Sequence, residues 1–262
     1  MALDVNSMWD YERPGLSEQR FREALAEASG DDVLVLRTQI ARTFSLRGRI
    51  DEAHAELDAI EPQLAAAGAE AKVRALLERG RTLRSAKQPA LARPLFMQAF
   101  ERADAAGLEY LAGDALHMVA LVESSLEGQV EWNRRTAQYA SGAGDPAARH
   151  WEAGAWNNLG VALNEAGRHA EALAAFEQAL AAHERTGKPN TVRIARWMVA
   201  HTLRLLGRTD EALARQLELE AQWQAAGETD PYVYEELAAL YEARGDATRA
   251  ARYRGMLEQA KR

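Results

Sequence analysis

Glycine recurs along this chain at an interval of about 40 residues. The main series consists of Gly48, Gly167, Gly207 and Gly245. Glycine adopts at little cost the left-handed backbone conformation that commonly ends a helix, so each of these glycines predicts the turn between two paired helices. Lys87 and Glu127 stand at the two intermediate positions of the series, where the turn must be made in another way. This interval predicts a protein built from helical repeats.

A second glycine series marks the other end of each predicted helix pair. Its members are separated by 39, 37, 43 and 40 residues, and they are Gly68, Gly107, Gly144, Gly187 and Gly227. Because the shortest and the longest interval together equal two ordinary ones, no repeat is lost between them. We therefore predict a local shift at Ser141–Asp145, with one helix shortened and the next extended, and a candidate joint near residues 141–147.

Two Asp-Pro pairs predict helix starts independently of the glycines. Asp145-Pro146 and Asp230-Pro231 each place a capping residue before a proline at the first helical position, where the missing N–H group is not needed. Ala, Leu, Glu and Arg dominate the chain, and β-branched residues form no alternating runs, so we expect an almost entirely helical protein. The predicted domains are an N-terminal segment with a capping helix at 1–30 and one helical superhelix at 31–262.

The fourth copy of the repeat is the best formed. Its spacings Trp156-x2-Leu159-Gly160 and Ala172-x3-Phe176 resemble the signature of the tetratricopeptide repeat (TPR) family. HEAT and armadillo repeats share the longer period of about 40 residues, but these two spacings favour the TPR family. The resemblance implies an all-α fold, a right-handed α-solenoid of about six helix pairs with an N-terminal capping helix. The chain also resembles stand-alone bacterial TPR proteins of unassigned activity.

Composition and motifs exclude several classes of function. The formal charge of −7 argues against a nucleic-acid-binding surface, and the absence of cysteine excludes disulfides, thiolate catalysis and cysteine-rich zinc sites. No histidines have metal-ligand spacing, and no phosphate-binding loop or nucleophile elbow is present, so we expect no metal, no cofactor and no enzymatic activity. The chain shows neither the pattern of a secretory signal nor an apolar run that would span a membrane, so we expect a cytoplasmic protein.

The resemblance to the TPR family implies a ligand-binding groove on the concave surface. The candidate groove residues, found at the family's ligand-contacting positions, are Arg42, Arg81, Arg84, His117, Asn157, Asn164, Trp197, His201 and Arg204. Across the first five repeats these positions hold five arginines and two histidines against one acid, Asp114. A basic groove in an acidic protein would attract an acidic segment. The alternative is that these arginines only keep an empty groove solvated.

Some candidates have a structural alternative of equal or greater weight. Trp197 is as well explained by the core as by ligand contact, and His117, beside Met118, is better explained as a structural histidine. Asn157 and Asn164 are poor helix formers in mid-helix, which favours ligand contact, but an asparagine that binds a neighbouring loop would give the same pattern.

We expect a non-enzymatic scaffold or adaptor that binds a protein or peptide segment, with acidic segments favoured. The alternative is a regulatory sensor that responds to a peptide or a small acidic ligand. Replacing Arg81, Arg84 and Arg204 together with serine is expected to abolish partner capture without unfolding the protein. The sequence leaves the identity of the partner and the oligomeric state open.

Overall fold

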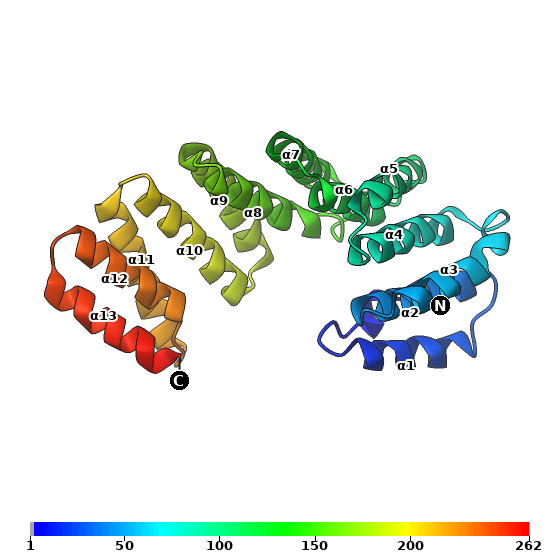
Figure 1. Ribbon diagram of the computed structural model, residues 1–262, viewed down its shortest axis with the longest axis horizontal. Helices are drawn as coiled ribbons and strands as arrows, with labels where there is room; N and C mark the ends of the chain where they lie inside the picture. Colours follow the sequence, from blue (N-terminus) through cyan, green and yellow to red (C-terminus); the bar gives the residue numbers. More distant parts are fainter. Residues whose placement is uncertain (1–2, 262) are drawn as a thin grey trace. The chain divides into compact units, whose positions relative to one another are not determined.

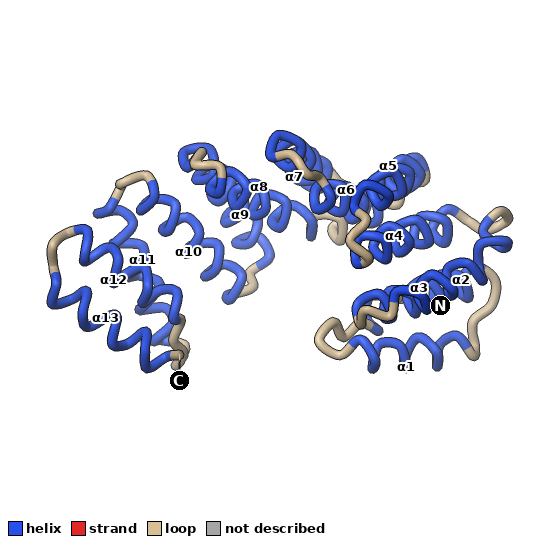
Figure 2. Tube along the Cα trace, viewed as in Figure 1, coloured by secondary structure: helices blue, strands red, loops and turns tan. Residues whose placement is uncertain are grey.

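The computed structural model describes residues 3–261, except for the side chain of Thr186. The predicted domains 1–30 and 31–262 therefore include residues that lie outside this description, namely residues 1, 2 and 262. Within the described chain, helices are joined by short loops and turns (Figure 2). They are a 3-10 helix at Asn6–Met8 and α1 (Pro14–Leu25), α2 (Asp31–Leu46), α3 (Ile50–Leu64), α4 (Ala69–Ser85), α5 (Pro89–Ala105), α6 (Glu109–Val122), α7 (Leu126–Gly142), α8 (His150–Glu165), α9 (His169–Thr186), α10 (Pro189–Leu205), α11 (Thr209–Ala225), α12 (Pro231–Ala243) and α13 (Ala247–Ala260). The predicted all-α solenoid class is confirmed.

The two helices of a pair approach closely where a glycine on the first helix faces a phenylalanine on the second. A Cβ atom at Gly160 would lie 2.6 Å from a ring carbon of Phe176, and one at Gly80 would lie 2.5 Å from a ring carbon of Phe96. Both phenylalanines are fully buried. The glycine therefore makes room for the ring, which is the packing that the Gly and Ala-x3-Phe spacings predict.

The chain divides into two compact units, residues 1–151 and 152–262. The first, unit 1, contains α1 and the pairs α2/α3, α4/α5 and α6/α7 (Figure 1). Helix α1 packs against α2 and places Phe21 in a core with Leu36 and Ile40. A second cluster, which includes Leu77 and Phe96, fills the space among α4, α5 and α6. The predicted capping helix thus covers the first pair by burying one aromatic side chain.

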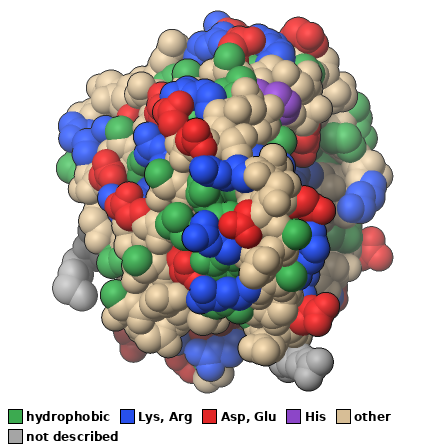
Figure 3. Space-filling view, turned by 90° about the vertical axis from the view of Figure 1, so that its left-hand side faces the viewer, with side chains coloured by type: hydrophobic (Ala, Val, Ile, Leu, Met, Phe, Trp, Pro, Cys, Tyr) green, Lys and Arg blue, Asp and Glu red, His purple; other side chains and the backbone are tan. Residues whose placement is uncertain are grey.

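Unit 2 contains the pairs α8/α9, α10/α11 and α12/α13. Within the last pair, α12 buries Leu237 and Leu240, whereas α13 buries only Ala250 and Tyr253. The face of the molecule drawn in Figure 3 carries basic and acidic side chains interspersed with apolar ones. The apolar residues of α13 therefore lie on the side that packs against α12.

Two turns between paired helices lack the glycine of the 40-residue series and are formed in other ways. Lys87 has a positive φ of 62° and so adopts the conformation that Gly207 adopts at the equivalent turn of unit 2, with φ 73°. The turn between α6 and α7 instead uses Ser125, whose Oγ accepts a hydrogen bond from the amide of Gly128.

One of the two predicted helix starts is wrong. Asp230 does cap α12, since its carboxylate accepts a hydrogen bond from the amide of Tyr232. Asp145 instead accepts from the amide of Ala147 at 2.8 Å and begins a separate turn, so that α8 starts only at His150. The side chain of Glu109 explains the difference, because it accepts from the amides of Gly144 and Asp145 at 3.2 and 2.6 Å and holds this backbone on α6.

Candidate ligand-binding surfaces

The surface formed by α2, α4 and α6 is called here the inner surface of unit 1, and a buried charge network lies on it. Arg81 on α4 forms ion pairs with Glu78 on the same helix and with Asp114 on α6. All three side chains are largely shielded from solvent. Burial disfavours the charge of Arg81, but Asp114 and then Glu78 outweigh burial and raise the pKa of the guanidinium. Burial likewise raises the pKa of Asp114, but Arg81 and Arg42 outweigh it and lower that pKa below its ordinary value.

Arg42 joins this network to the N-terminal segment. Its Nη1 lies 3.6 Å from Glu78 Oε1, and its guanidinium carbon lies 5.2 and 5.4 Å from the ring centroids of Trp9 and Tyr11. The two rings are stacked on each other, and Trp9 also donates a hydrogen bond to Gln39. Arg42 Nε and Glu78 Oε2 are buried without a hydrogen-bond partner. Cation–π contacts of this kind replace part of the hydration that Arg42 loses.

Arg84 and His117 lie further along the same surface, and they differ in how far their side chains are free to contact a ligand. Arg84 is exposed, and its side chain makes no hydrogen bond or ion pair within residues 3–261. His117 is half-buried and stacks on Trp151 at a centroid distance of 5.2 Å. Burial lowers the pKa of His117 below its ordinary value, with the carboxylate of Asp114 opposing that effect. His117 is therefore neutral near pH 7 and packs as an aromatic side chain.

The first helices of unit 2, α8, α10 and α12, form the inner surface of unit 2, which is more apolar. Trp197 stacks on His201 with a centroid distance of 4.9 Å and contacts the edge of Tyr232 at 6.0 Å. Ile194 and Tyr232 leave 55% and 65% of their surface exposed. The indole Nε1 of Trp197 is buried and unpaired, so the ring is held by packing. Three large apolar side chains thus gather beside one another with part of their surface free.

A buried carboxylate adjoins this aromatic group. Glu236 on α12 accepts two hydrogen bonds of 2.8 Å from Arg204 and one of 2.8 Å from His201 Nδ1. Because a carboxylate can only accept, His201 donates through Nδ1 and leaves Nε2 for another partner. Burial raises the pKa of Glu236, but the hydrogen bonds from His201 and Arg204 outweigh it, so that pKa is lowered overall. Glu236 therefore stays charged and fixes both basic side chains.

The two asparagines of α8 have different surroundings. The side-chain Nδ2 of Asn164 donates a hydrogen bond to Thr202 Oγ1 at 2.9 Å, and its Oδ1 lies 3.0 Å from His169 Nδ1. Its amide thus ties α8 to α10 and α9. Asn157 is half-buried, and its side-chain amide makes no hydrogen bond within the described residues, so this amide can bind a ligand.

These contacts change the expected charge of the inner surfaces. Sequence reasoning counted Asp114 alone among the acids of the first five repeats and missed Glu78 and Glu236, which neutralise Arg81 and Arg204. Glu78 lies three positions before Arg81 on one helix, and Glu236 directly follows Glu235, so both adjoin residues at the ligand-contacting positions of the repeat, and this spacing could have revealed them. In the variant that replaces Arg81, Arg84 and Arg204 with serine, Glu78 and Asp114 would stay buried without the cation of Arg81, so we now expect that variant to lose stability as well as partner capture.

The described residues contain no group of three or more His, Asp or Glu side chains arranged to hold a metal ion. No helix among them is both long enough and apolar enough to cross a membrane.

Paired helices in series, with side chains of successive first helices forming one surface in each unit, define a helical-repeat protein by architecture. Residues 151–218 match the tetratricopeptide repeat family. The matched segment includes Trp156 and Phe176, where the resemblance to that family was first seen, and it confirms the resemblance. No curated protein matches this sequence.

Solved structures match the fold over almost the whole chain. The apo form of RapI gives a TM-score of 0.77 at 10% identity, covering 95% of this chain and 71% of that one. A STAND protein with a tetratricopeptide repeat sensor from Pyrococcus horikoshii gives 0.75 at 13% identity, covering 94% of this chain but only 39% of that one. A Rap protein complexed with competence and sporulation factor gives 0.52 at 16% identity, covering 98% and 73%. At these identities the likeness is one of fold.

Proposed function

We propose that this protein is a non-enzymatic scaffold that binds a segment of a partner protein or a peptide on its inner surfaces. The observation that carries the proposal is the partly exposed group of Ile194, Trp197 and Tyr232 on the inner surface of unit 2. A few large apolar side chains in a fixed setting supply most of the affinity at protein interfaces. The Rap protein complexed with competence and sporulation factor supports binding by this fold.

The charge pattern refines what such a segment would carry. Arg204 and His201 are fixed by Glu236, whereas Arg84 in unit 1 is exposed and unpaired within the described chain. A segment bound on unit 2 would gain affinity from the apolar contacts there, and a segment bound on unit 1 would meet Arg84, which favours acidic residues. The cytoplasmic location expected from the sequence belongs to the same proposal.

Affinity capture from a lysate of the source organism tests this function. We compare the wild type with the double variant Ile194→Ser/Tyr232→Ser, and use Leu91→Ser, which alters a leucine on α5 that is 59% exposed, as the matched control. Partners should be retained by the control and lost by the double variant, with unchanged circular dichroism. The same partners on all three proteins would contradict the proposal.

A ligand-responsive sensor is the second candidate function. The buried, unpaired Arg42 Nε and Glu78 Oε2 favour it, since each buried unpaired polar group costs about 1–3 kcal/mol that a rearrangement could recover. The fold likeness to a protein with a tetratricopeptide repeat sensor supports the same idea. Addition of a captured partner segment would then change the radius of gyration in small-angle X-ray scattering, whereas a scaffold would leave it unchanged.

A further inference from the structure

A pocket of about 470 Å³ lies on the opposite side of α4 from the inner surface of unit 1, between α3 and α5. The network residues of α4 include Glu78 and Arg81, whereas the pocket is lined by Leu76 and Arg79, each two positions earlier. Two positions correspond to about 200° around a helix axis, so the two surfaces share the helix but face away from each other. This pocket is called here the outer pocket.

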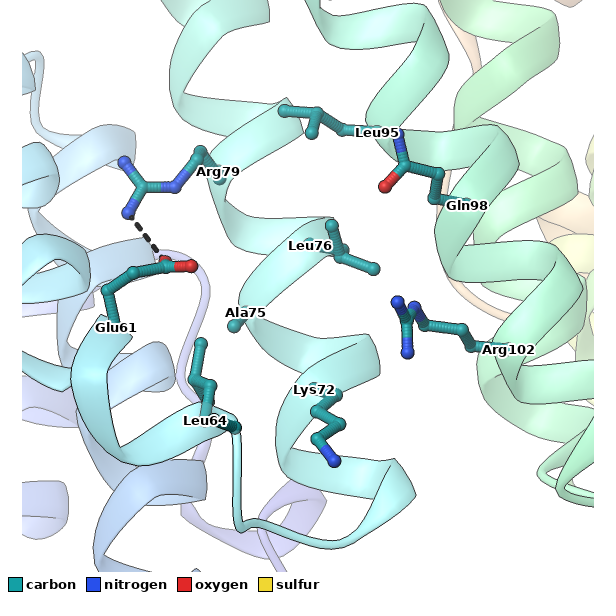
Figure 4. Close-up of a pocket in the computed structure, with 10 residues that line it drawn as sticks. Glu61, Leu64, Lys72, Ala75, Leu76, Arg79, Leu95, Gln98 and Arg102 are labelled. Atoms are coloured by element: carbon teal, nitrogen blue, oxygen red, sulfur yellow. Dashed lines mark hydrogen bonds and ion pairs between the residues drawn. The ribbon is translucent and has the colours of Figure 1, made fainter.

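The floor of the outer pocket is apolar. Leu64 from α3, Leu76 from α4 and Leu95 from α5 converge on it, and each is only half-buried (Figure 4). Partly exposed leucines that line one concavity lose solvent contact when an apolar side chain enters, which is the main source of affinity in such sites.

Unpaired positive charges border this floor. Arg79 is paired with Asp58 at 2.8 Å and with Glu61 at 3.3 Å on the α3 side (Figure 4). Lys72 and Arg102 line the pocket as well, and the side chain of neither makes a hydrogen bond or ion pair within residues 3–261. Since the only acid of the lining, Glu61, is already paired, the outer pocket offers a net positive field beside leucines.

The position in unit 2 that corresponds to the outer pocket is lined by different side chains. Helices α10 and α11 begin and end 120 residues after α4 and α5, so Leu76, Leu95 and Arg102 correspond to Arg196, Arg215 and Gln222. Two adjoining pockets of about 190 and 500 Å³ lie there, both lined by Glu184, Arg196 and Gln222, and Arg196 pairs with Glu184 at 3.1 Å. The repeat architecture therefore does not by itself produce an apolar floor with free cations, and the outer pocket is a property of these particular side chains.

We propose that the outer pocket is a second binding site, which takes a partner peptide segment carrying aliphatic side chains next to acidic ones. The aliphatic side chains pack on Leu64, Leu76 and Leu95, and the carboxylates pair with Lys72 and Arg102. Two leucine side chains and a carboxylate fit in the volume of the pocket, which is within the range of small binding sites. This inference does not depend on the function proposed for the inner surfaces.

Fluorescence anisotropy on the full chain tests the site with defined probes. The first is Gly-Leu-Leu-Glu-Glu-Gly with fluorescein on its N-terminal amine and an amidated C-terminus, and its two counterparts replace both leucines with serine or both glutamates with lysine. Only the first peptide should bind, and binding should weaken with added salt. Lys72→Gln/Arg102→Gln should weaken it about tenfold, which is the size expected for two exposed charge pairs. Leu76→Arg, which introduces the side chain of the equivalent position in unit 2, should abolish it.

Controls separate the outer pocket from the rest of the molecule. Lys188→Gln removes an exposed cation elsewhere, and Ile194→Ser/Tyr232→Ser removes the apolar group of the inner surface; both should bind the first peptide like the wild type. Equal binding by the pocket variants, equal binding of all three peptides, or no binding at millimolar concentration would overturn the proposal. Binding of decanoate in the absence of peptide binding would also overturn it, because it would make the pocket a site for fatty acid anions.

Discussion

At the scale of single residues, the charge network of α4 and α6 separates structural from available charges. Arg81 lies between Glu78 and Asp114, and all three side chains are shielded from solvent. A charged residue at a ligand-contacting position of the repeat is therefore not necessarily available to a ligand. Acidic residues at neighbouring positions can neutralise it, as Glu78 does for Arg81.

Removing one member of this network should be costly. Asp114→Asn leaves Arg81 with one carboxylate, and breaking a buried pair in this way is expected to lower the free energy of unfolding by about 3–5 kcal/mol. Glu70→Gln removes an exposed partner of Arg74 and serves as the control, with an expected change below about 0.5 kcal/mol. Urea unfolding followed by circular dichroism measures the free energy of unfolding of both variants. Similar losses of free energy in the two would show that the buried network stabilises the protein no more than an exposed ion pair does.

His117 adds a pH dependence of a definite sign. Because burial lowers its pKa in the folded protein, the unfolded chain binds a proton first as pH falls below the ordinary histidine value of 6.5. Stability should therefore decline from about pH 6.5 downward, before the loss that follows when carboxylates such as Asp114 are protonated through their lowered pKa. His117→Gln should reduce the first decline only. Urea midpoints measured between pH 4 and 8 test this, and an unchanged profile in the variant would rule it out.

Gly160 offers a direct test of helix-pair packing. Gly160→Ala places a Cβ atom 2.6 Å from the ring of Phe176, and the resulting overpacking should lower stability by about 1–3 kcal/mol despite the better helix propensity of alanine. Gly154 lies on the same helix with nothing within 4 Å of its Cβ position. Gly154→Ala should raise stability by up to about 1 kcal/mol, and opposite signs in urea unfolding are the expected result.

At the scale of elements, most turns between the two helices of a pair depend on one residue in the left-handed conformation. Lys87 adopts a left-handed conformation that disfavours a side chain, so Lys87→Gly should stabilise the protein by about 1 kcal/mol. The reverse change at the equivalent turn, Gly207→Lys, should destabilise it by a similar amount. Thermal unfolding of both variants shows whether these turns obey the same rule; a loss of stability in Lys87→Gly would mean that the lysine side chain makes a contact that outweighs its backbone strain.

The elements were predictable from the sequence because their signals are local. Glycine spacing and the Trp156 and Phe176 patterns identify helix pairs, since a turn and a buried seam depend on residues near one another in the chain. Asp145-Pro146 failed as a helix start because Glu109, 36 residues earlier, binds this backbone. The partner of Arg204 was missed for a similar reason, as Glu236 lies on the next helix pair, whereas Glu78 lies three positions before Arg81 on the same helix and was accessible to local reasoning.

At the scale of the whole molecule, each of the two units has its own core, and the segment 143–149 lies close to their boundary. Glu109 holds its start, and Arg149 donates to the carbonyl oxygen of Ala143 at 3.2 Å. Glu109→Gln should weaken two charge-assisted hydrogen bonds and make trypsin cleavage after Arg149 several times faster, because cleavage requires local opening. Glu101→Gln, an exposed change on α5, is the control, and equal digestion rates would show that Glu109 does not protect this segment.

The two glycines that face phenylalanine rings also provide a spectroscopic reporter. One α-proton of Gly80 and one of Gly160 occupy the directions in which a Cβ atom would meet Phe96 and Phe176. A proton so close to an aromatic ring experiences the magnetic field of the ring electrons, and its NMR resonance moves away from the usual glycine position. Since Gly80 belongs to one unit and Gly160 to the other, two resolved signals would report the integrity of each unit separately during binding or unfolding.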